Sequence, residues 1–456
     1  MSTLNRRDVL KLAAGGTASV CLPRVTIAAG ADYDVVIIGA GIAGMTAARL
    51  LSKAGPGLKV LVLEARSRVG GRLMTLQREE EYLPAEGVEL GASLIHGSEA
   101  GTWDLVNEFQ FTTRPLPPRS AEARDAVMAR LATAWDNRSS GDLSYAAFLD
   151  TLALNPEDRE IALSATPFDW ADPTAISASA VVRDSGLWHT WHDQDFQLLA
   201  GHSALAARLS HEIEGRIQLN SVVDEIFWRP GLVGVSYTLN GSSTALTCRQ
   251  LVITVPLGVL QSNTLKIDPP LPPDMAAALK GLAMSEEVVV PMVFSQPFTA
   301  LAGWRDNNGF SLFDTPLGPS TGVLGHFTGT AAGELTGLAQ EAATARVLRW
   351  LEEASGQAGL GGKLAWHKVK DWSRDPFSQG GRSFARPGAA ALRASLSLPV
   401  EGTLYVAGEA TALVPHYATV HGAYMSGVRV ADQVANALNV GTPSDADGEE
   451  SLFQLL

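Results

Sequence analysis

Three glycines near the start of the chain have the spacing of a phosphate-binding turn. Residues 35–44 read VVIIGAGIAG, in which Gly39, Gly41 and Gly44 follow a run of β-branched residues as G-x-G-x-x-G. In such a turn the first glycine allows a sharp bend, the second lets the backbone approach a pyrophosphate, and the third lets the following helix pack closely on the strand. The first N–H groups of that helix then point at the phosphates.

An acidic residue stands at the distance expected for the same kind of site. Residues 34–38 and 59–63 predict two buried strands, with a helix at 45–52 between them, and Glu64 follows the second strand 20 residues after Gly44. An acid in this place can hydrogen-bond the adenosine ribose of a dinucleotide. Strand, glycine turn, helix, strand and acid occur in the expected order, so the sequence predicts a dinucleotide-binding site.

The residues from Glu64 onward indicate which dinucleotide is bound. They read EARSRVGGRLMT and resemble the E-A-x-x-R-x-G-G-R segment of the flavin-containing amine oxidase superfamily. Further stretches resemble the same family: LGASLIHG at 90–97, IQLN at 217–220, LVITVPLGVL at 251–260, WSRDPFSQGGRSF at 372–384, and LYVAGEATALVPHYATVHGAYMSGVRVADQV from 404. The matches run from about residue 33 to 440. The resemblance implies an FAD-dependent oxidoreductase rather than a nicotinamide enzyme.

The resemblance also implies which residues contact the FAD. Val223 would touch the adenine end, Gly408 and Glu409 the ribityl chain and pyrophosphate, and the helix starting at Thr419 and Val420 would face the pyrimidine of the flavin. The full set of implied contacts is Gly39, Gly41, Ile42, Ala43, Gly44, Glu64, Ala65, Arg66, Gly71, Arg72, Leu73, Gly91, Ala92, Ser93, Leu94, Val223, Trp372, Gly408, Glu409, Thr419 and Val420. No cysteine stands where monoamine oxidases bond their flavin, so non-covalent FAD is expected.

Positions that distinguish the varieties of this family are unusual here. Val289 occupies the place of a lysine that contacts the flavin through water, which argues against a rapid reaction with oxygen. Arg382 stands where polyamine oxidases and histone demethylases carry a tyrosine of the aromatic cage, and Phe384 takes the second aromatic place. Arg382 could bind a carboxylate through two nitrogens or point to solvent. Thr419 replaces the tyrosine of monoamine oxidases on the opposite wall.

Histidines offer a further candidate for substrate chemistry. His96 is placed by the resemblance near the edge of the flavin ring, where it could accept a proton, bind a polar substituent, or pack as a structural histidine. In WHTWHDQDF at 188–196, His189 and His192 are three residues apart, but no further metal ligand is apparent. We therefore predict an aromatic cavity or core face there and no metal site. The substrate-facing candidates are His96, Arg382 and Phe384, without an assigned catalytic residue.

The cofactor motifs occur in separate blocks of the chain, which predicts how the elements are organised. We expect an α/β fold with a discontinuous Rossmann-like FAD-binding domain and an intergrown α+β substrate domain. The FAD-binding domain takes 32–100, 200–262 and 400–440, and the substrate domain takes 101–199 and 263–399. Helical apolar spacing in TWDLVNEF and AEARDAVMARLATAW supports this division, as does the strand-like VVVPMVF. Residues 441–456 are polar and acidic before a short apolar tip, as expected of a mobile tail.

Composition limits the partners that the protein can have. The 456 residues are 46% hydrophobic and carry a net charge of −13, which describes a soluble globular protein and argues against nucleic acid or an anionic membrane as partner. The only cysteines are Cys21 and Cys248. No internal disulfide is therefore expected once the N-terminus is removed. A homodimer is one assembly that the sequence allows.

The N-terminal segment, residues 1–31, resembles a twin-arginine export signal. Arg6 and Arg7 precede the apolar run LKLAAGGTASVCL, and a small-residue site closes the segment. The run is too short and too rich in glycine to span a bilayer, so no transmembrane segment is expected. The expected location is the periplasm or the exterior, with FAD taken up before export. The alternative is a disordered or anchoring N-terminus.

The resemblance and the residues together predict a reaction class. The expected substrate is a small amine or amino acid, oxidised to an imine at its C–N bond, with oxygen or another redox carrier as electron acceptor. Val289 and Arg382 leave open a flavin dehydrogenase or desaturase that acts on a non-amine. A third alternative is an FAD-binding protein whose catalytic wall has decayed and which serves as a binding or structural partner.

Overall fold

A computed structural model describes most of the chain. The described residues are 30–76, 82–84, 86–116, 122–139, 141–164, 170–191, 194–262, 264–298 and 309–441. The export signal, apart from its last two residues, and nearly all of the predicted tail therefore lie outside the described residues, as does His192. None of the helices in the described ranges is both long and apolar enough to cross a membrane.

A large sheet forms the part of the molecule that carries the glycine turn. Its strand order is β12-β9-β10-β11-β1-β2-β8, with β20 beside β11. Strands β1, β2, β8, β11 and β20 run parallel to their neighbours in this group. The bounds are β1 Tyr33–Ile38, β2 Val60–Leu63, β8 Ile217–Gln218, β9 Ser221–Arg229, β10 Leu232–Leu239, β11 Ser242–Ile253, β12 Lys266–Asp268 and β20 Leu404–Val406. The predicted α/β fold with a Rossmann-like domain is confirmed.

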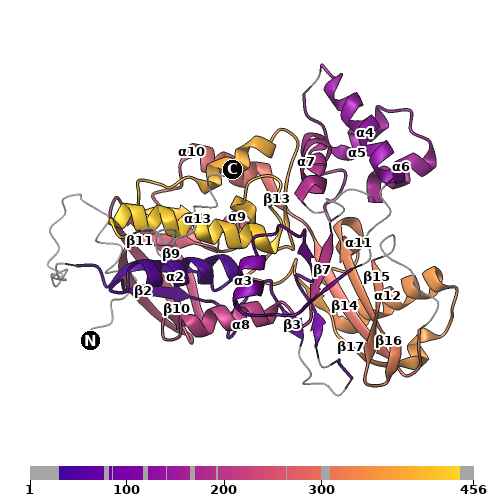
Figure 1. Cartoon of the computed structure of the whole chain (residues 1–456), viewed down its shortest axis with the longest axis horizontal. Helices are drawn as coiled ribbons and strands as arrows, with labels where there is room; N and C mark the ends of the chain where they lie inside the picture. The colour runs from indigo at the N-terminus through magenta and orange to yellow at the C-terminus, as the bar shows by residue number, and fades with distance from the viewer. Residues whose placement is uncertain are drawn as a thin grey trace.

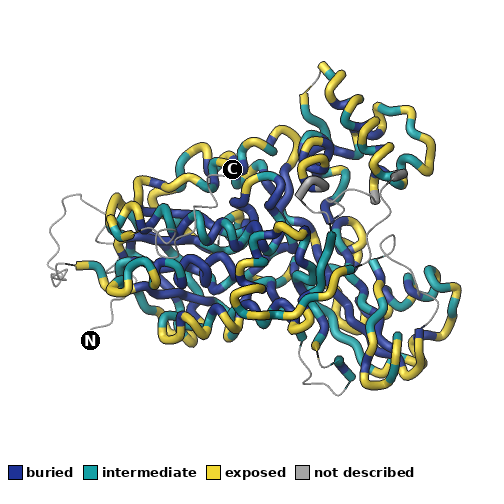
Figure 2. The backbone as a smooth tube through the Cα atoms, in the orientation of Figure 1, coloured by how far each residue is buried: buried dark blue, intermediate teal, exposed yellow. Residues whose placement is uncertain are grey.

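Both faces of this sheet are covered, because β1 sends alternate side chains into two different cores. Val35 and Ile37 pack under α2 (Ile42–Ala54), α8 (Ser203–Glu212) and α13 (Val420–Leu438). Val36 and Ile38 belong to the opposite core, which includes residues of α10 (Pro273–Gly281) and η2 (Ala390–Ser397). Figure 1 shows α2 and α13 lying along the sheet, and most of β1 and all of β2 are buried (Figure 2). Strand β12, α10 and η2 thus pack with the large sheet, although the sequence places them in the second insert.

A second, five-stranded sheet belongs to the other half of the molecule. Its strands are β15 (Phe310–Thr315), β16 (Gly318–Thr328), β14 (Glu287–Phe294), β17 (Leu364–His367) and β18 (Lys370–Asp371). The even-numbered residues of β14, such as Val288 and Val290, pack under α12 (Gln340–Ser355). The odd-numbered Val289 instead packs with Leu90 and Trp372. The face of β14 that carries Val289 therefore packs against Leu90, which lies in the segment 32–100 predicted for the FAD-binding domain.

Two smaller units complete the second half. A three-stranded sheet pairs β7 (Asp195–Leu198) with β5 (Ile95–His96) and β6 (Thr113–Pro115). A helical unit, at the upper right of Figure 1, contains α4 (Glu122–Asp136), α5 (Tyr145–Asp150), α6 (Pro156–Ser164) and α7 (Ala178–Trp191). Its apolar core is formed mainly by side chains of these helices, including Leu131, Phe148 and Val181. Helices and strands thus share the inserted segments, as an α+β arrangement requires.

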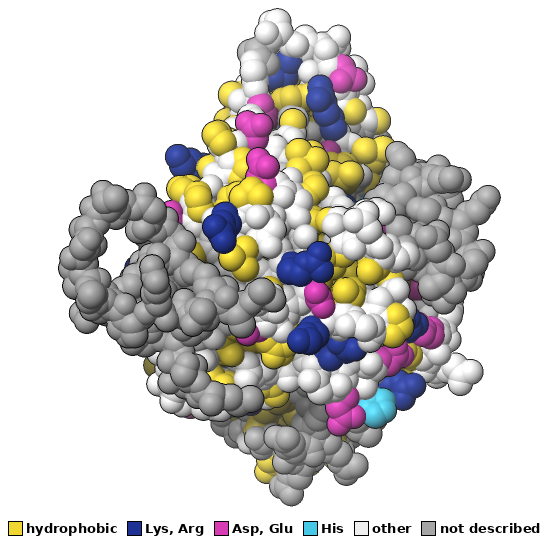
Figure 3. All heavy atoms as spheres, turned by 90° about the vertical axis from the view of Figure 1, so that its left-hand side faces the viewer, with side chains coloured by type: hydrophobic (Ala, Val, Ile, Leu, Met, Phe, Trp, Pro, Cys, Tyr) yellow, Lys and Arg dark blue, Asp and Glu magenta, His cyan; other side chains and the backbone are white. Residues whose placement is uncertain are grey.

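The surface on the left-hand side of the molecule in Figure 1 has charges of both signs. Figure 3 shows this end, with Lys and Arg side chains lying between Asp, Glu and hydrophobic side chains. The net charge of −13 is therefore not concentrated on this face.

The glycine turn between β1 and α2 is held by close backbone packing. Gly39 has φ +105°, a left-handed conformation that glycine adopts readily. A Cβ at Gly44 would overlap the carbonyl oxygen of Gly39, so the helix can approach the strand end only because Gly44 has no side chain. A Cβ at Gly41 would meet nothing within 4 Å. The packing of this turn therefore requires glycine at positions 39 and 44, whereas it leaves room for a side chain at Gly41.

This difference gives a prediction for the protein without FAD. Gly44→Ala should lower its free energy of unfolding by roughly 1–3 kcal/mol, because overpacking against backbone outweighs the better helix propensity of alanine. Gly41→Ala is the matched control and should leave that stability within about 0.5 kcal/mol of the wild type. Chemical denaturation of the three apoproteins measures both changes. Equal stability of the Gly44 variant and the wild type would contradict the packing described for this turn.

Candidate functional site

A cavity of about 1200 Å³ lies at the carboxyl ends of the parallel strands. Residues that follow β1, β2, β11 and β20 line it, namely Gly39, Glu64, Thr254 and Gly408. Ligands of open α/β sheets bind at this edge. All the FAD contacts implied by the sequence line the cavity except Gly44, which packs behind the turn.

The start of α2 offers the cavity an anion-binding surface. Its N-cap is Gly41, which provides no side-chain hydrogen bond, and the first turn has no acidic residue. The first N–H groups of a helix have no partner within the helix, and they carry partial positive charge. Gly41 also pairs as an isolated bridge with Gly70, so the second glycine segment lies beside the turn. This surface has room and charge for a pyrophosphate.

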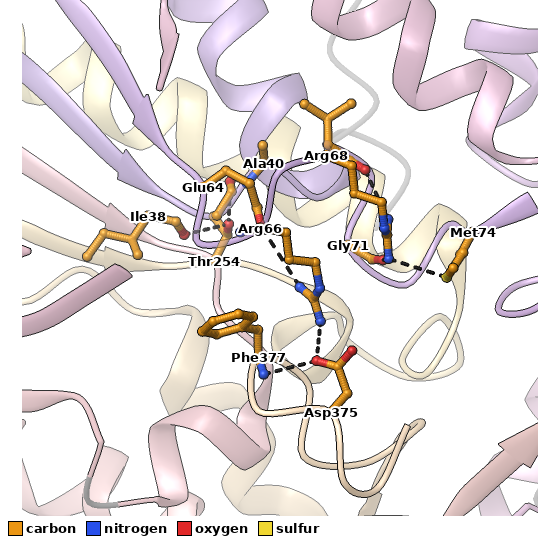
Figure 4. Close-up of polar contacts among 12 residues, drawn as sticks. Ile38, Ala40, Glu64, Arg66, Arg68, Gly71, Met74, Thr254, Asp375 and Phe377 are labelled. Carbon is orange, nitrogen blue, oxygen red and sulfur yellow. Dashed lines mark hydrogen bonds and ion pairs between the residues drawn. The ribbon is translucent and has the colours of Figure 1, made fainter. Parts of the chain in front are cut away.

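Glu64 is fixed by backbone hydrogen bonds at the end of β2. Its Oε2 accepts from the Ala40 N–H at 2.8 Å and its Oε1 from the Arg66 N–H at 2.9 Å. The residue is 3% exposed and lines the cavity. Each carboxylate oxygen has a second lone pair for a hydroxyl donor. Figure 4 shows the carboxylate beside Ala40 at the glycine turn.

Arg66 and Arg68 hold the segment after Glu64 in different ways. Arg66 Nη2 forms an ion pair of 2.5 Å with Asp375 Oδ1, and Lys370 Nζ lies 2.5 Å from the other oxygen. Burial alone would raise the pKa of Asp375, but the two cations outweigh it and lower that pKa. Arg68 instead donates to the Gly71 carbonyl at 2.8 Å, inside its own loop. Figure 4 shows Arg66 reaching Asp375 and Arg68 turned towards Gly71 and Met74.

Arg72 and Glu409 form a second ion pair in the cavity wall. Arg72 Nη1 lies 3.0 Å from Glu409 Oε1, and Glu409 Oε2 accepts from Ser383 Oγ at 2.7 Å and from the Ala418 N–H at 3.1 Å. Both charged side chains are therefore neutralised where they line the cavity. The uncapped start of α2, the buried carboxylate of Glu64 and the glycine turn between β1 and α2 therefore fit a dinucleotide such as FAD.

The only cysteine in the described part of the chain lies away from the cavity. Cys248 is buried in β11 with an exposed fraction of 0%, and burial raises the pKa of its thiol. A buried, protonated thiol is unreactive.

His96 lies in the part of the cavity beyond the glycine turn. It pairs with Asp195 across β5 and β7, and its Nδ1 lies 2.7 Å from Asp195 Oδ1. The His96 ring is 5.6 Å from the Trp188 ring, which is 6.3 Å from the Trp170 ring. All four side chains line the cavity, so this part of WHTWHDQDF forms an aromatic cavity wall, as the sequence predicts.

Arg382 also lies in the cavity wall and does not simply point to solvent. Its Nε is 3.4 Å from Glu287 Oε2, and its guanidinium carbon is 5.1 Å from the centre of the Trp170 ring. Glu287 Oε1 lies 3.2 Å from His326 Nε2. Burial alone would raise the pKa of Glu287, but the charges of Arg382 and Arg72 and the contact with His326 lower it to about 2. Glu287 is therefore a carboxylate at neutral pH.

Two of the residues singled out by the sequence lie elsewhere. Phe384 is 4% exposed and packs with the core of the helical unit, so it does not line the cavity as expected. The chain leaves the cavity wall after Arg382, because in β19 (Ser383–Ala385) Ser383 bonds Glu409 and Phe384 packs with the helical unit. Val289 is 1% exposed and does not line the cavity either.

Sequence reasoning missed several polar groups of the substrate wall. Glu287, His326 and Asp195 line the cavity, yet none was a candidate. Glu287 is the one charged residue in β14, EVVVPMVF, and a charge in such an apolar strand was an available signal. His326 had no such signal, because it comes close to Glu287 only through pairing of β14 with β16.

The lowered pKa of Glu287 predicts a pH dependence of stability. Relative to its ordinary value of 4.5, a folded pKa of about 2 contributes roughly 3 kcal/mol above pH 4.5, and this contribution is lost as the pH falls towards 2. Glu287→Gln removes the charge but keeps the shape. The difference in free energy of unfolding between wild type and variant, measured by denaturant titration from pH 6 to pH 2, should therefore shrink below pH 4.5. A difference independent of pH would refute the assignment.

Comparisons with known proteins agree with this arrangement. The family described as flavin containing amine oxidoreductase matches residues 146–435, and a NAD(P)-binding Rossmann-like domain matches residues 37–109. Polyamine oxidase 4 of Oryza sativa subsp. japonica is 26% identical over 91% of this chain and 91% of its own length. Lysine-specific histone demethylase 1 homolog 3 of Arabidopsis thaliana is 28% identical over 92% of this chain, which spans only 31% of that relative.

A solved structure shows the same fold. Cyclohexylamine oxidase from Brevibacterium oxydans superposes with a TM-score of 0.71 at 20% identity, over 90% of this chain and all of the other. The flavin containing amine oxidoreductase family matches well over half of the 456 residues. The chain therefore belongs to this family of FAD-dependent oxidoreductases.

Proposed function

We propose that this protein oxidises a small amine or an amino acid at its C–N bond, giving an imine. The observation that carries the proposal is a single cavity in which dinucleotide-binding elements meet a wall of charged and aromatic side chains. Arg382, Glu287 and His96 supply polar contacts in that wall, and Trp170 and Trp188 supply apolar surface. The names of the related polyamine and cyclohexylamine oxidases support an amine as the substrate class.

The residues at the sheet edge would hold the cofactor. The start of α2 would bind the pyrophosphate, Glu64 the adenosine ribose, and Arg72 the flavin side of the dinucleotide. Bound FAD would supply the acceptor for a hydride equivalent from the carbon beside nitrogen. The burial of Cys248, away from the cavity, supports non-covalent binding.

His96 is the proposed proton acceptor on the substrate side. An amine must be neutral before its neighbouring carbon can release a hydride equivalent, and an ammonium therefore has to lose a proton. Asp195 holds the His96 ring through Nδ1, which orients the imidazole towards the cavity that both residues line. The aromatic wall beside it excludes water from the reacting atoms.

The electron acceptor proposed for this enzyme is a redox carrier in preference to oxygen. Val289 packs with Leu90 and Trp372 at the place where the family carries a lysine. Lys370, paired across the strands with Val289, is bound to Asp375. Lys370 therefore does not take the place of that lysine, and preorganised charge of this kind can change rates by powers of ten.

Flavin bleaching without oxygen tests the reaction class. The purified protein should contain FAD that acid releases from the chain, and a panel of amines and amino acids added under nitrogen should bleach it. Mixing the reduced protein with oxygenated buffer, and separately with a cytochrome, then compares the two acceptors by stopped flow. Bleaching by no member of the panel would favour a non-amine substrate or a decayed enzyme. Fast reoxidation in air would overturn the proposed acceptor.

We also propose export through the twin-arginine route, with the periplasm or the exterior as destination. Arg6 and Arg7 before an apolar run support this proposal. Residues 1–31 fused to a folded reporter should carry it out of the cytoplasm, and Arg6→Lys with Arg7→Lys should retain it. Fractionation of cells that express the two fusions measures this. Export that survives the double substitution would exclude the twin-arginine route.

A further inference from the structure

We propose that Arg382 and Glu287 form a two-charge site that selects an α-amino acid in its zwitterionic form over simple amines and simple carboxylates. The inference rests on the amine-oxidising function proposed above and names its substrate class. It is carried by an ion pair in the cavity wall, where the side chain of Arg382 is 28% exposed and that of Glu287 6%.

The guanidinium of Arg382 is held through its Nε, which leaves the edge with the two Nη groups available to a ligand. Its Nε faces Glu287 Oε2 at 3.4 Å, and the cation lies over the Trp170 ring. Among the described residues, none forms a hydrogen bond with its two Nη groups. The planar fork of an arginine binds a carboxylate through two parallel hydrogen bonds. The carboxylate of an amino acid can therefore bind Arg382 without breaking the contact with Glu287.

Glu287 supplies the opposite charge beside it. Its oxygens face His326 and Arg382, and a carboxylate has about four lone-pair positions, so an ammonium can share them. Its backbone N–H is not available to a ligand, because it already donates to Ser373 Oγ at 3.0 Å. A Cβ at Gly381 would overlap the Glu287 side chain, which shows how closely the loop before Arg382 approaches the acid.

The two opposite charges decide which ligands bind well. A ligand with only a negative charge is attracted by Arg382 but repelled by Glu287. A ligand with only a positive charge is attracted by Glu287 but repelled by Arg382. A zwitterion with adjacent carboxylate and ammonium gains from both charges at once. The same pair therefore binds an α-amino acid more tightly than a polyamine, whose charges are all positive.

The wall next to the ion pair suits an apolar side chain. Trp170 is followed by Trp188 at 6.3 Å between ring centres, and both line the cavity. Aromatic rings favour apolar or aromatic ligand groups at such distances. Phenylalanine is therefore a suitable probe, with 2-phenylethylamine and 3-phenylpropanoate as analogues that lack one of the two charges.

Calorimetry of the FAD-loaded protein under nitrogen tests the selection. We expect DL-phenylalanine to bind roughly tenfold or more tightly than either analogue, because each lacks a charge-assisted contact. Arg382→Gln should remove this preference, and Arg386→Gln, an exposed arginine four residues later, is the matched control that should keep it. Glu287→Gln should weaken phenylalanine binding and strengthen 3-phenylpropanoate binding, since the repulsion of the anion is removed.

The results separate this inference from the proposed reaction. Tight binding of phenylalanine that depends on Arg382 supports the two-charge site even if the flavin is not bleached, in which case the proposed reaction fails. Equal or tighter binding of 2-phenylethylamine would overturn the site, even if that amine bleaches the flavin. No binding of phenylalanine, or unchanged binding in Arg382→Gln, would overturn it too. FAD content and thermal unfolding show whether each variant is folded. Arg382→Lys, which keeps the positive charge, is the conservative comparison for Arg382→Gln.

Discussion

The contact between Gly44 and the carbonyl of Gly39 is the constraint on which the candidate site depends. It allows α2 to begin directly at the end of β1, so that the first N–H groups of the helix face the cavity. The same turn brings the Ala40 N–H to Glu64, which fixes the carboxylate at the end of β2. Because α13 packs on α2, the helix start at Thr419 is held at the same edge.

Ion pairs control the chemistry of the cavity beyond this turn. Arg66 is paired with Asp375, Arg72 with Glu409 and Arg382 with Glu287. Burying unpaired charges costs several kcal/mol each, and paired charges often add little stability, so their retention points to binding or orientation. A cavity with matched charges holds polar ligands without binding every small ion, which suits an enzyme that must select both a dinucleotide and a small substrate.

The residues predicted for the cofactor half of this site meet in one cavity, whereas several polar residues of the substrate half were not predicted. The glycine turn, Glu64 and Arg72 belong to local motifs, whose geometry is set within one strand–turn–helix unit. The substrate wall is assembled across β14, β16 and β7, which lie far apart in the chain, so His326 and Asp195 were not found. Phe384 failed for a related reason, because it packs with helices that lie far away in the sequence. A charge within the apolar β14 was the one usable sign of Glu287.

A crystal structure of the protein with FAD and phenylalanine, grown without oxygen, would test the account most directly. We expect the ribose hydroxyls on Glu64, the pyrophosphate at the start of α2, and the ligand carboxylate on the Nη groups of Arg382. A dinucleotide bound away from the glycine turn would contradict the assigned cofactor site. A phenylalanine whose carboxylate avoids Arg382 would contradict the assigned substrate wall.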